Sequence, residues 1–188
     1  ENKFGISQHE FDKLIDIIKK SEHINFYGLH FHIGSQITRV SEVFALECKR
    51  VNEIVAYFER NGLRVDNINL GGGLGVDYDD PDENAIADFK TWFETISANI
   101  CRRNDQTVHV EPGRSLVAQC ATLISRVLFV KSGETKNFLI MDAGMNDLIR
   151  PALYGAYHKI ENLSAAQRTF FPTHQAYDIV GPVCESSD

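Results

Sequence analysis

Hydrophobic residues recur at helical spacing in three stretches of the first part of the chain. The first stretch follows Ser7 and Glu10, whose spacing is that of a capping box at the start of a helix. The second begins near Ser41 and ends before Gly62, a residue suited to a helix C-terminus. The third covers residues 86–100. The pattern therefore predicts three amphipathic helices.

A short apolar run follows each predicted helix, at residues 24–33, 65–70 and 108–110. Runs of this length and composition are typical of β-strands. Helices and strands therefore alternate along this part of the chain, as they do in α/β folds with a parallel sheet.

The pattern changes in the later part of the chain. Residues 116–131, 137–142 and 175–183 are rich in valine, isoleucine, leucine and phenylalanine, with turn signals between them and no long helical period. We therefore predict two domains, an α/β unit over residues 1–114 and a second unit, built mainly of antiparallel strands, over residues 115–188.

The composition argues against several kinds of partner. The 188-residue chain has a formal charge of −7 and a pI near 5.5, which disfavours binding to nucleic acid or to an anionic membrane surface. It contains no apolar run approaching the roughly twenty residues of a membrane-spanning helix. Its four cysteines are widely scattered, without the spacing of a metal or redox motif. We expect a cytoplasmic protein and interpret the two ends of the chain as cuts through a longer protein.

Two histidines, His30 and His32, end the first predicted strand, shortly before Ser35. The alternation of side chains along a strand places both histidines on one face. They can be polar residues satisfied within the strand, or they can hold a metal ion, as a His-x-His pair does in barrel hydrolases. The motif alone leaves both interpretations open.

Three successive glycines, Gly71, Gly72 and Gly73, follow the second predicted strand. Without a Cβ, the backbone can approach a ligand closely and direct N–H groups at an anion. A sharp turn would usually need only one glycine. The segment therefore favours a phosphate site, although it is neither a Walker loop nor a dinucleotide-binding motif.

A carboxylate and a guanidinium, Glu111 and Arg114, follow the third predicted strand around a Pro-Gly turn that includes Gly113. They can form a simple surface ion pair. At the strand ends of an α/β barrel they can also bind opposite poles of one ligand, because Arg114 suits a phosphate or carboxylate and Glu111 suits a protonated nitrogen.

These three motifs, in this order and at this spacing, resemble those of the alanine-racemase-like barrel decarboxylases that use pyridoxal 5'-phosphate. Residues 141–154 and 181–186 are similar to the diaminopimelate decarboxylase branch rather than to the ornithine branch. The resemblance covers nearly the whole chain, and the motifs are specific in combination. It implies an α/β fold that consists of part of a (β/α)8 TIM-like barrel followed by part of a mainly antiparallel β-domain.

The resemblance also implies which residues bind the cofactor. His32 is expected to stack on the pyridine ring, and Glu111 is expected to face the ring nitrogen. Ser35, the glycine turn and Arg114 resemble the family's phosphate site. The complete set of implied cofactor-binding residues is His32, Ser35, Gly71, Gly72, Gly73, Glu111, Gly113 and Arg114. No metal site is expected.

The substrate contacts follow from the same resemblance. Arg150 and Tyr154 resemble the residues that bind the distal carboxylate of the substrate, with Arg114 as a further contact. Cys184 resembles the family's proton donor, and Glu185 the carboxylate that receives the distal ammonium. In this family the last two residues reach the active site of a partner subunit. The resemblance therefore implies a homodimer with active sites shared across the interface.

The implied reaction is the decarboxylation of meso-2,6-diaminopimelate to L-lysine and CO2 in lysine biosynthesis. The lysine that forms the Schiff base with the cofactor is expected upstream of His32, because none of the nine lysines in the chain stands at a strand end in a suitable context. The chain by itself is therefore expected to be inactive.

Three other interpretations remain open. A related decarboxylase can act on arginine, ornithine or carboxynorspermidine, although the later segments argue against this. A metal-dependent barrel hydrolase can use His30, His32, His109 and Glu111, but it leaves the glycines unexplained. A non-catalytic relative would be expected to have lost the cofactor motifs, which are intact here.

Overall fold

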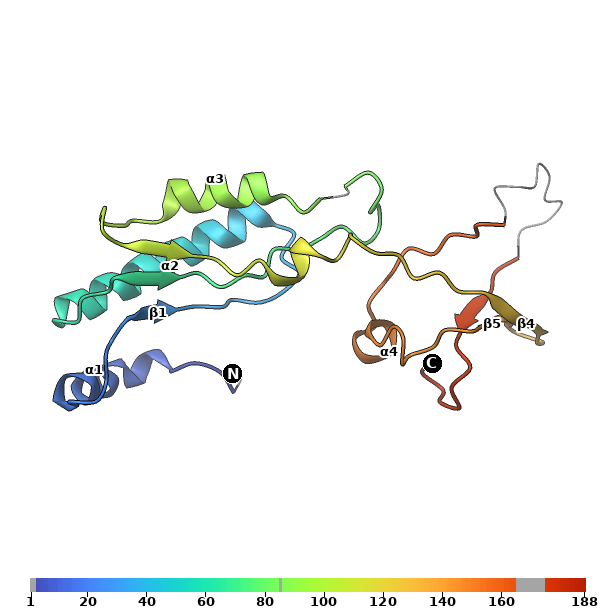
Figure 1. The fold of residues 1–188 in the computed structure, drawn as a ribbon, viewed down its shortest axis with the longest axis horizontal. Helices are drawn as coiled ribbons and strands as arrows, with labels where there is room; N and C mark the ends of the chain where they lie inside the picture. The colour runs from blue at the N-terminus through green and yellow to red at the C-terminus, as the bar shows by residue number, and fades with distance from the viewer. Residues whose placement is uncertain (1–2, 85, 165–174) are drawn as a thin grey trace. The chain divides into compact units, whose positions relative to one another are not determined.

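The computed structural model describes residues 3–84, 86–164 and 175–188, which form two units (Figure 1). The first unit consists of Glu1–Val76 and Ala85–Gln119, and the second of Asp77–Asn84 and Cys120–Asp188. The short segment Asp77–Asn84 thus belongs with residues that follow it by more than thirty positions in the chain.

The first unit contains a parallel sheet of three strands, β1 (Gly28–His30), β2 (Asn67–Asn69) and β3 (Thr107–His109). They lie in the order β1-β2-β3, with Leu29 opposite Ile68. The predicted parallel α/β arrangement is confirmed. Because neighbouring strands run in the same direction, their C-terminal ends meet at one edge of the sheet.

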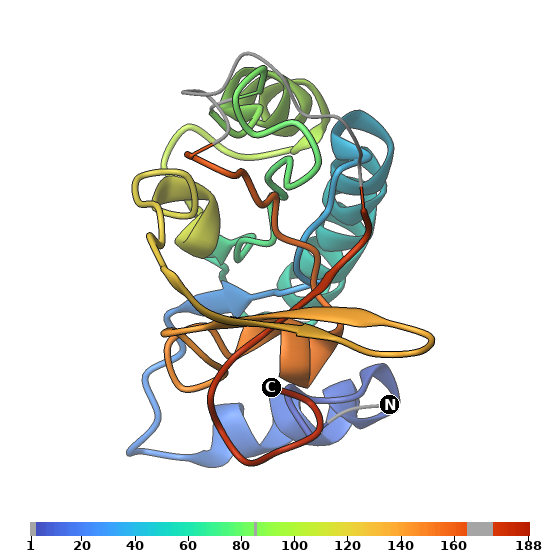
Figure 2. The ribbon, with the colours of Figure 1, turned by 90° about the vertical axis from the view of Figure 1, so that its right-hand side faces the viewer.

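Three helices accompany this sheet, α1 (Phe11–Lys20), α2 (Val40–Arg60) and α3 (Phe89–Asn99). Helices α2 and α3 pack side by side (Figures 1 and 2), and their interface is aromatic. The rings of Phe44 and Trp92, both fully buried, lie 5.6 Å apart. The three predicted helices are therefore confirmed. Their apolar faces contribute to the core of this unit.

The ends of the helices differ in how well the sequence predicted them. Gly62 has a φ of 78° and donates its N–H to the carbonyl of Glu59 at 2.9 Å, as expected for the residue that stops α2. The predicted capping box is wrong. A short 3-10 turn, η1 (Gln8–Glu10), precedes α1, and the side chain of Ser7 makes no capping hydrogen bond. The Ser7 carbonyl instead accepts the Glu10 N–H at 2.9 Å.

The second unit contains a mixed sheet of β4 (Val127–Ser132), β5 (Asn137–Met141) and β6 (Asp178–Val180), together with the short helix α4 (Arg150–Tyr154). The predicted antiparallel pairing is present between β4 and β5, whereas β6 pairs parallel to β5. A long connection that includes α4 separates β5 from β6, so the chain can return in the same direction. Of the apolar run at residues 116–131, only the part from Val127 onward forms a strand.

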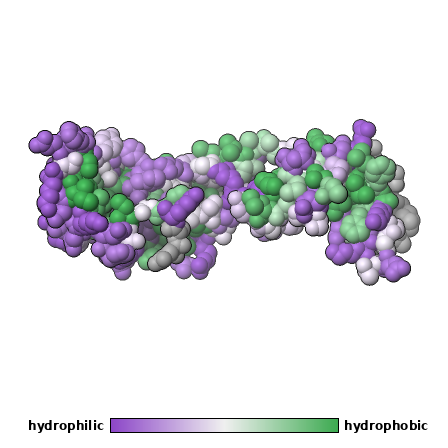
Figure 3. Space-filling view, turned by 90° about the horizontal axis from the view of Figure 1, so that it is seen from below, coloured by the Kyte–Doolittle hydropathy of each residue, from purple (hydrophilic) through white to green (hydrophobic). Residues whose placement is uncertain are grey.

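Hydrophobic side chains remain on the surface of the second unit. All six residues of β4 are exposed, and the strand lies at one edge of its sheet. In Figure 3 hydrophobic atoms, drawn green, form patches among the hydrophilic ones, which are drawn purple. No helix in the described ranges is long and apolar enough to cross a membrane.

One acidic residue lies within the core of the first unit. Glu47 on α2 is only 4% exposed, and neither of its carboxylate oxygens has a hydrogen-bond partner. Burial raises the pKa of Glu47 to about 7, because the charged form loses its hydration. The folded chain therefore keeps this proton to a much higher pH than the unfolded chain does.

Replacing Glu47 with glutamine should stabilise the chain at pH 8 and change its stability little at pH 5. The pKa of Glu47 in the folded chain lies above its ordinary value of 4.5. Between these two values the unfolded chain binds fewer protons, so the free energy of unfolding decreases as the pH rises. Glu47→Gln should recover roughly 1–3 kcal/mol of this decrease, measured by urea unfolding at both pH values. The matched variant Glu42→Gln, on the exposed face of α2, should recover none, and equal effects of the two variants would contradict the prediction.

Candidate functional site

The backbone of the first unit continues its ladder of hydrogen bonds beyond the ends of the three strands. The Phe31 N–H donates to the Asn69 carbonyl at 2.8 Å, and the Leu70 N–H to the His109 carbonyl at 2.9 Å. The Glu111 N–H donates to the carbonyl of Gly71. The segments that follow β1, β2 and β3 therefore lie side by side, and all three predicted motifs meet at this edge of the sheet.

The three glycines permit this close approach. A Cβ on Gly72 would lie 1.8 Å from the carbonyl oxygen of Glu111, and a Cβ on Gly71 would lie 2.3 Å from that of Phe31. A Cβ on Gly73 would lie 2.3 Å from the carbonyl oxygen of Gly34. Each glycine thus has a packing role at the strand ends, in addition to the turn and the phosphate site that the sequence analysis considered.

Arg114 connects the third motif to the first. It lies on the short 3-10 helix η2 (Gly113–Leu116), and its Nη2 donates to Ser35 Oγ and to Gln36 Oε1, each at 3.1 Å. Gln36 has a φ of 59°, which makes it the one non-glycine residue with a positive φ in the described part of the chain. Its amide bonds to the backbone of Val76, which fixes its position. The structure thus brings Ser35 and Arg114 together, and it adds Gln36 to the pair.

Glu111 lies beside polar side chains from the other two strands. Its Oε1 accepts a hydrogen bond from Asn69 Nδ2 at 2.8 Å, and its Oε2 lies 3.4 Å from His30 Nε2. The other side-chain atom of this amide, Asn69 Oδ1, accepts the Gly71 N–H at 2.8 Å. The sequence analysis missed Asn69, although a polar residue between the buried Ile68 and Leu70 was a signal that could have identified it.

His32 lies at the same edge. Its Nδ1 is 3.5 Å from the N–H of Gly72, and its side chain is exposed. His30 and His32 are both more exposed than Phe31 between them, as the predicted alternation requires.

Of the four residues considered as metal ligands, His30 and Glu111 come together, but His109 does not join them. His109 Nε2 pairs with Asn67 Oδ1 at 2.9 Å instead of joining His30 and Glu111. Within residues 3–84, 86–164 and 175–188, no group of three or more histidine, cysteine, aspartate or glutamate side chains is placed to hold a metal ion. The arrangement of these residues therefore gives no support to a metal-dependent hydrolase.

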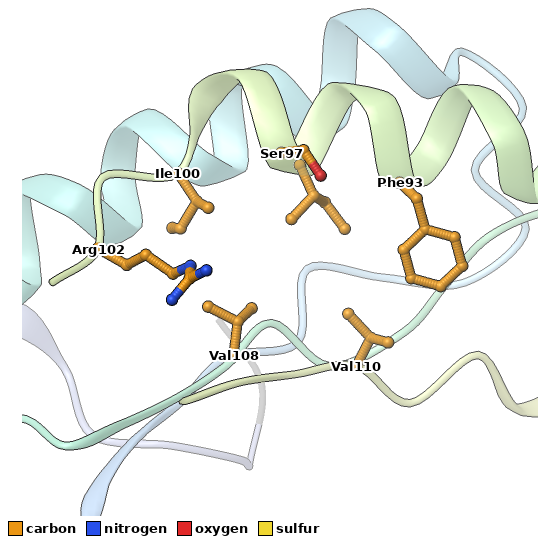
Figure 4. A pocket seen from close by; sticks show the side chains of 7 residues that line it. Phe93, Ser97, Ile100, Arg102, Val108 and Val110 are labelled. Carbon is orange, nitrogen blue, oxygen red and sulfur yellow. The ribbon is translucent and has the colours of Figure 1, made fainter. Parts of the chain in front are cut away.

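A separate pocket lies between α3 and β3 (Figure 4). Its lining is mostly aliphatic, with Arg102 as the single charged side chain of the set. The lining residues are Phe93, Ile96, Ser97, Ile100, Arg102, Val108 and Val110. None of the glycines, carboxylates or histidines at the strand ends contributes to this pocket, so it is distinct from the candidate site.

The second unit brings together the two residues that resemble the family's binding site for the substrate carboxylate. The guanidinium carbon of Arg150 lies 5.6 Å from the ring centroid of Tyr154. It lies the same 5.6 Å from the ring of Tyr78, a residue that the sequence analysis did not identify. Arg150 is partly exposed, but its Nε is buried and has no hydrogen-bond partner.

Cys184 and Glu185 occupy an exposed turn near the end of the second unit. The Glu185 N–H donates to the carbonyl of Val183 at 2.8 Å, and the Val183 N–H donates to Asp188 Oδ2 at 2.7 Å. These bonds hold the turn and leave the thiol and the carboxylate on its surface.

Comparison with known proteins assigns the chain to a family. A family model described as pyridoxal-dependent decarboxylase, pyridoxal binding domain, matches residues 1–118. The chain belongs to the pyridoxal-dependent decarboxylases. This match includes all three strand-end motifs of the first unit.

Several curated relatives of the chain are diaminopimelate decarboxylases. The chain is 50% identical over 188 residues to the enzyme of Bacteroides thetaiotaomicron, covering 100% of the chain and 47% of that protein. It is 39% identical over 187 residues to the enzyme of Neisseria meningitidis serogroup B, covering 100% of the chain and 43% of that protein. The chain thus spans less than half the length of these relatives.

Solved structures share the fold of this chain. A diaminopimelate decarboxylase of Helicobacter pylori complexed with L-lysine has a TM-score of 0.80 at 37% identity, covering 100% of the chain and 44% of that protein. A lysine/ornithine decarboxylase of Vibrio vulnificus complexed with putrescine has a TM-score of 0.77 at 21% identity, covering 99% of the chain and 48% of that protein. At this lower identity the likeness shows the fold alone. The predicted fold, part of an α/β barrel followed by part of a β-rich domain, agrees with these neighbours.

Replacing Gly72 with alanine should destabilise the chain more than replacing Gly113 with alanine. Gly72 does not have a positive φ, so alanine would not strain its backbone. The added methyl group would instead clash with the backbone of Glu111 and push the ends of β2 and β3 apart. Gly113 has a φ of 57° and open space around its Cβ position, so its replacement should cost about 1–2 kcal/mol of backbone strain. Urea unfolding of the two variants measures the difference. Equal losses of stability would show that the strand ends are not closely packed.

Proposed function

We propose that the protein containing this chain is a diaminopimelate decarboxylase, which converts meso-2,6-diaminopimelate to L-lysine and CO2 in lysine biosynthesis. The observation that carries this proposal is the 50% identity, over the whole chain, with the diaminopimelate decarboxylase of Bacteroides thetaiotaomicron. Residues 1–114 would form the C-terminal part of its cofactor-binding barrel, and residues 115–188 part of its β-rich domain.

The donor groups at the strand ends suit the phosphate of pyridoxal 5'-phosphate. Arg114 supplies a planar, charged donor, and Ser35 supplies a hydroxyl that already lies 3.1 Å from it. The glycine turn would add backbone N–H groups, of which those of Gly71 and Gly72 would have to turn from Asn69 Oδ1 and His32 Nδ1 to reach an anion. We therefore assign phosphate binding to Ser35, Gly71, Gly72, Gly73, Gly113 and Arg114.

The remaining strand-end groups suit a protonated aromatic ring. The Glu111 carboxylate, which accepts a hydrogen bond from Asn69 and lies beside His30, would accept a hydrogen bond from the ring nitrogen and favour its protonated form. The exposed imidazole of His32 would stack on the ring face. When bound, pyridoxal phosphate supplies a conjugated ring that accepts the electron pair left by the loss of CO2.

The second unit would provide substrate recognition and a proton. Meso-diaminopimelate has two carboxylates, and L-lysine retains one of them. Arg150 and Tyr154 would bind the retained carboxylate, with Arg114 as a further contact, and Glu185 would receive the ammonium beside it. The Cys184 thiol would donate a proton to the carbon that has lost CO2. Cys184 and Glu185 would act in the site of a second subunit of a cytoplasmic homodimer.

A decarboxylase assay of the full-length protein tests this proposal. With pyridoxal phosphate added, the enzyme should release CO2 and form L-lysine from meso-diaminopimelate, with kcat/KM at least about a hundred-fold higher than for L-ornithine or L-arginine. Such discrimination is expected because a substrate without the second carboxylate leaves the Arg150 guanidinium unpaired. A preference for either of the other two amino acids would overturn the proposed substrate.

Replacing Arg114 with alanine in the full-length protein should weaken the binding of pyridoxal phosphate by about ten- to a hundred-fold, because a charge-assisted contact to the phosphate is lost. Cofactor binding is measured by equilibrium dialysis. Arg102→Ala is the matched control, because Arg102 is an exposed arginine that lines the separate pocket. Equal affinity of the two variants for the cofactor would remove Arg114 from the phosphate site.

Replacing Cys184 with alanine should leave cofactor binding unchanged and lower kcat by about a hundred-fold or more, as expected for loss of a proton donor. The control is Cys101→Ala, because Cys101 is also an exposed, free thiol. Cofactor content is measured by absorbance, and turnover by the formation of lysine. Turnover equal to that of the control would exclude Cys184 from the reaction.

A further inference from the structure

Arg150 contacts two tyrosine rings that come from distant parts of the sequence. Its guanidinium carbon is 5.6 Å from the ring centroids of both Tyr78 and Tyr154. Tyr154 is only four residues away on the same short helix and is 68% exposed. Tyr78 precedes Arg150 by more than seventy residues and is less exposed. Contact with Tyr78 therefore depends on the tertiary fold of the second unit.

Tyr78 is presented by a loop that has its own polar contacts. Asp77 Oδ1 accepts the N–H groups of Asp79 and Asp80 at 2.9 and 3.0 Å, and Asp77 Oδ2 accepts a hydrogen bond from Asn84 Nδ2 at 2.8 Å. These bonds join the residue before Tyr78 to residues after it, so the loop itself stabilises the backbone conformation at Tyr78.

The second unit also holds this loop from outside. The ring of His158 packs edge-on against Tyr78, with centroids 5.1 Å apart and an interplanar angle of 66°. The next residue, Lys159, forms an ion pair with Asp82 on the same loop and a second with Glu161 at 2.8 Å. The position of the Tyr78 ring is therefore determined by contacts on its own loop and on residues 158–159.

A guanidinium that contacts two aromatic rings can bind a ligand only through its edge. Aromatic faces attract the cation and exclude water from it, while the N–H groups at its edge can bind a planar acceptor such as a carboxylate. In Arg150 these are the groups other than the buried Nε. An arginine without such neighbours loses more side-chain entropy when it binds. The ring contacts therefore favour a guanidinium that is already oriented for a carboxylate.

We propose that Tyr78 is a positioning residue that holds Arg150 for the carboxylate retained in L-lysine. This inference rests on the proposed function, which makes Arg150 a carboxylate-binding residue. Tyr78 acts through the face of its ring, and His158 supports that ring from the side. Tyr78 also follows the glycine turn closely in sequence, so the chain leads directly from the phosphate-binding segment to the support of the substrate-binding arginine.

Two ligands that differ by one carboxylate test the role of Tyr78 in the full-length enzyme with its cofactor bound. L-lysine retains the carboxylate assigned to Arg150, whereas 1,5-diaminopentane lacks it. Tyr78→Leu should weaken L-lysine binding by about ten-fold and leave 1,5-diaminopentane binding unchanged. It should raise the KM for diaminopimelate to a similar extent, with a smaller effect on kcat. Tyr78→Phe keeps the ring and should behave like the wild type, as should Tyr157→Leu, which replaces an exposed tyrosine of the same unit.

The outcomes separate the failure of this inference from the failure of the proposed function. If Arg150→Met leaves L-lysine affinity unchanged, the proposed role of Arg150 is wrong and the inference falls with it. If Arg150→Met weakens L-lysine binding but Tyr78→Leu does not, only the inference about Tyr78 is overturned. It is also overturned if Tyr78→Leu weakens both ligands equally, which indicates a general structural role, or if Tyr78→Phe is as weak as Tyr78→Leu, which indicates a role for the hydroxyl.

Discussion

Parallel pairing of β1, β2 and β3 leaves no room for a side chain at the three glycines that follow β2. A Cβ at Gly72 would lie 1.8 Å from the Glu111 carbonyl oxygen, and the Glu111 N–H bonds to the Gly71 carbonyl next to it. This close approach brings the residues after three separate strands within hydrogen-bonding reach of one another. Without it, Arg114 could not contact Ser35, a residue that lies 79 positions earlier in the chain.

The chemistry divides between the two units. Acceptors and donors suited to a phosphorylated aromatic cofactor lie on the strand ends of the first unit. The arginine that would bind a substrate carboxylate lies on α4 of the second unit, where aromatic rings flank it. Such a division would let the residues that choose the substrate change without altering the strand ends.

Local patterns predicted the elements well and their tertiary contacts poorly. The apolar stripe of α2 and the glycine that stops it were visible in the sequence because both are features of a single helix. The parallel pairing of β6 and the contacts of Asn69 and Gln36 were not, because each depends on residues far away in the chain. The same holds for Tyr78, which meets Arg150 only in the folded unit. The capping box failed because the backbone of Ser7 and Glu10 forms a turn that competes with the side-chain bond.

A crystal structure of the full-length protein with pyridoxal phosphate tests most directly whether the strand ends form the cofactor site. We predict that the phosphate lies within hydrogen-bonding distance of the Arg114 guanidinium and of N–H groups in the glycine turn. The Glu111 carboxylate should then face the ring nitrogen. A phosphate bound in the pocket between α3 and β3, or a Glu111 that does not contact the ring, would contradict this assignment.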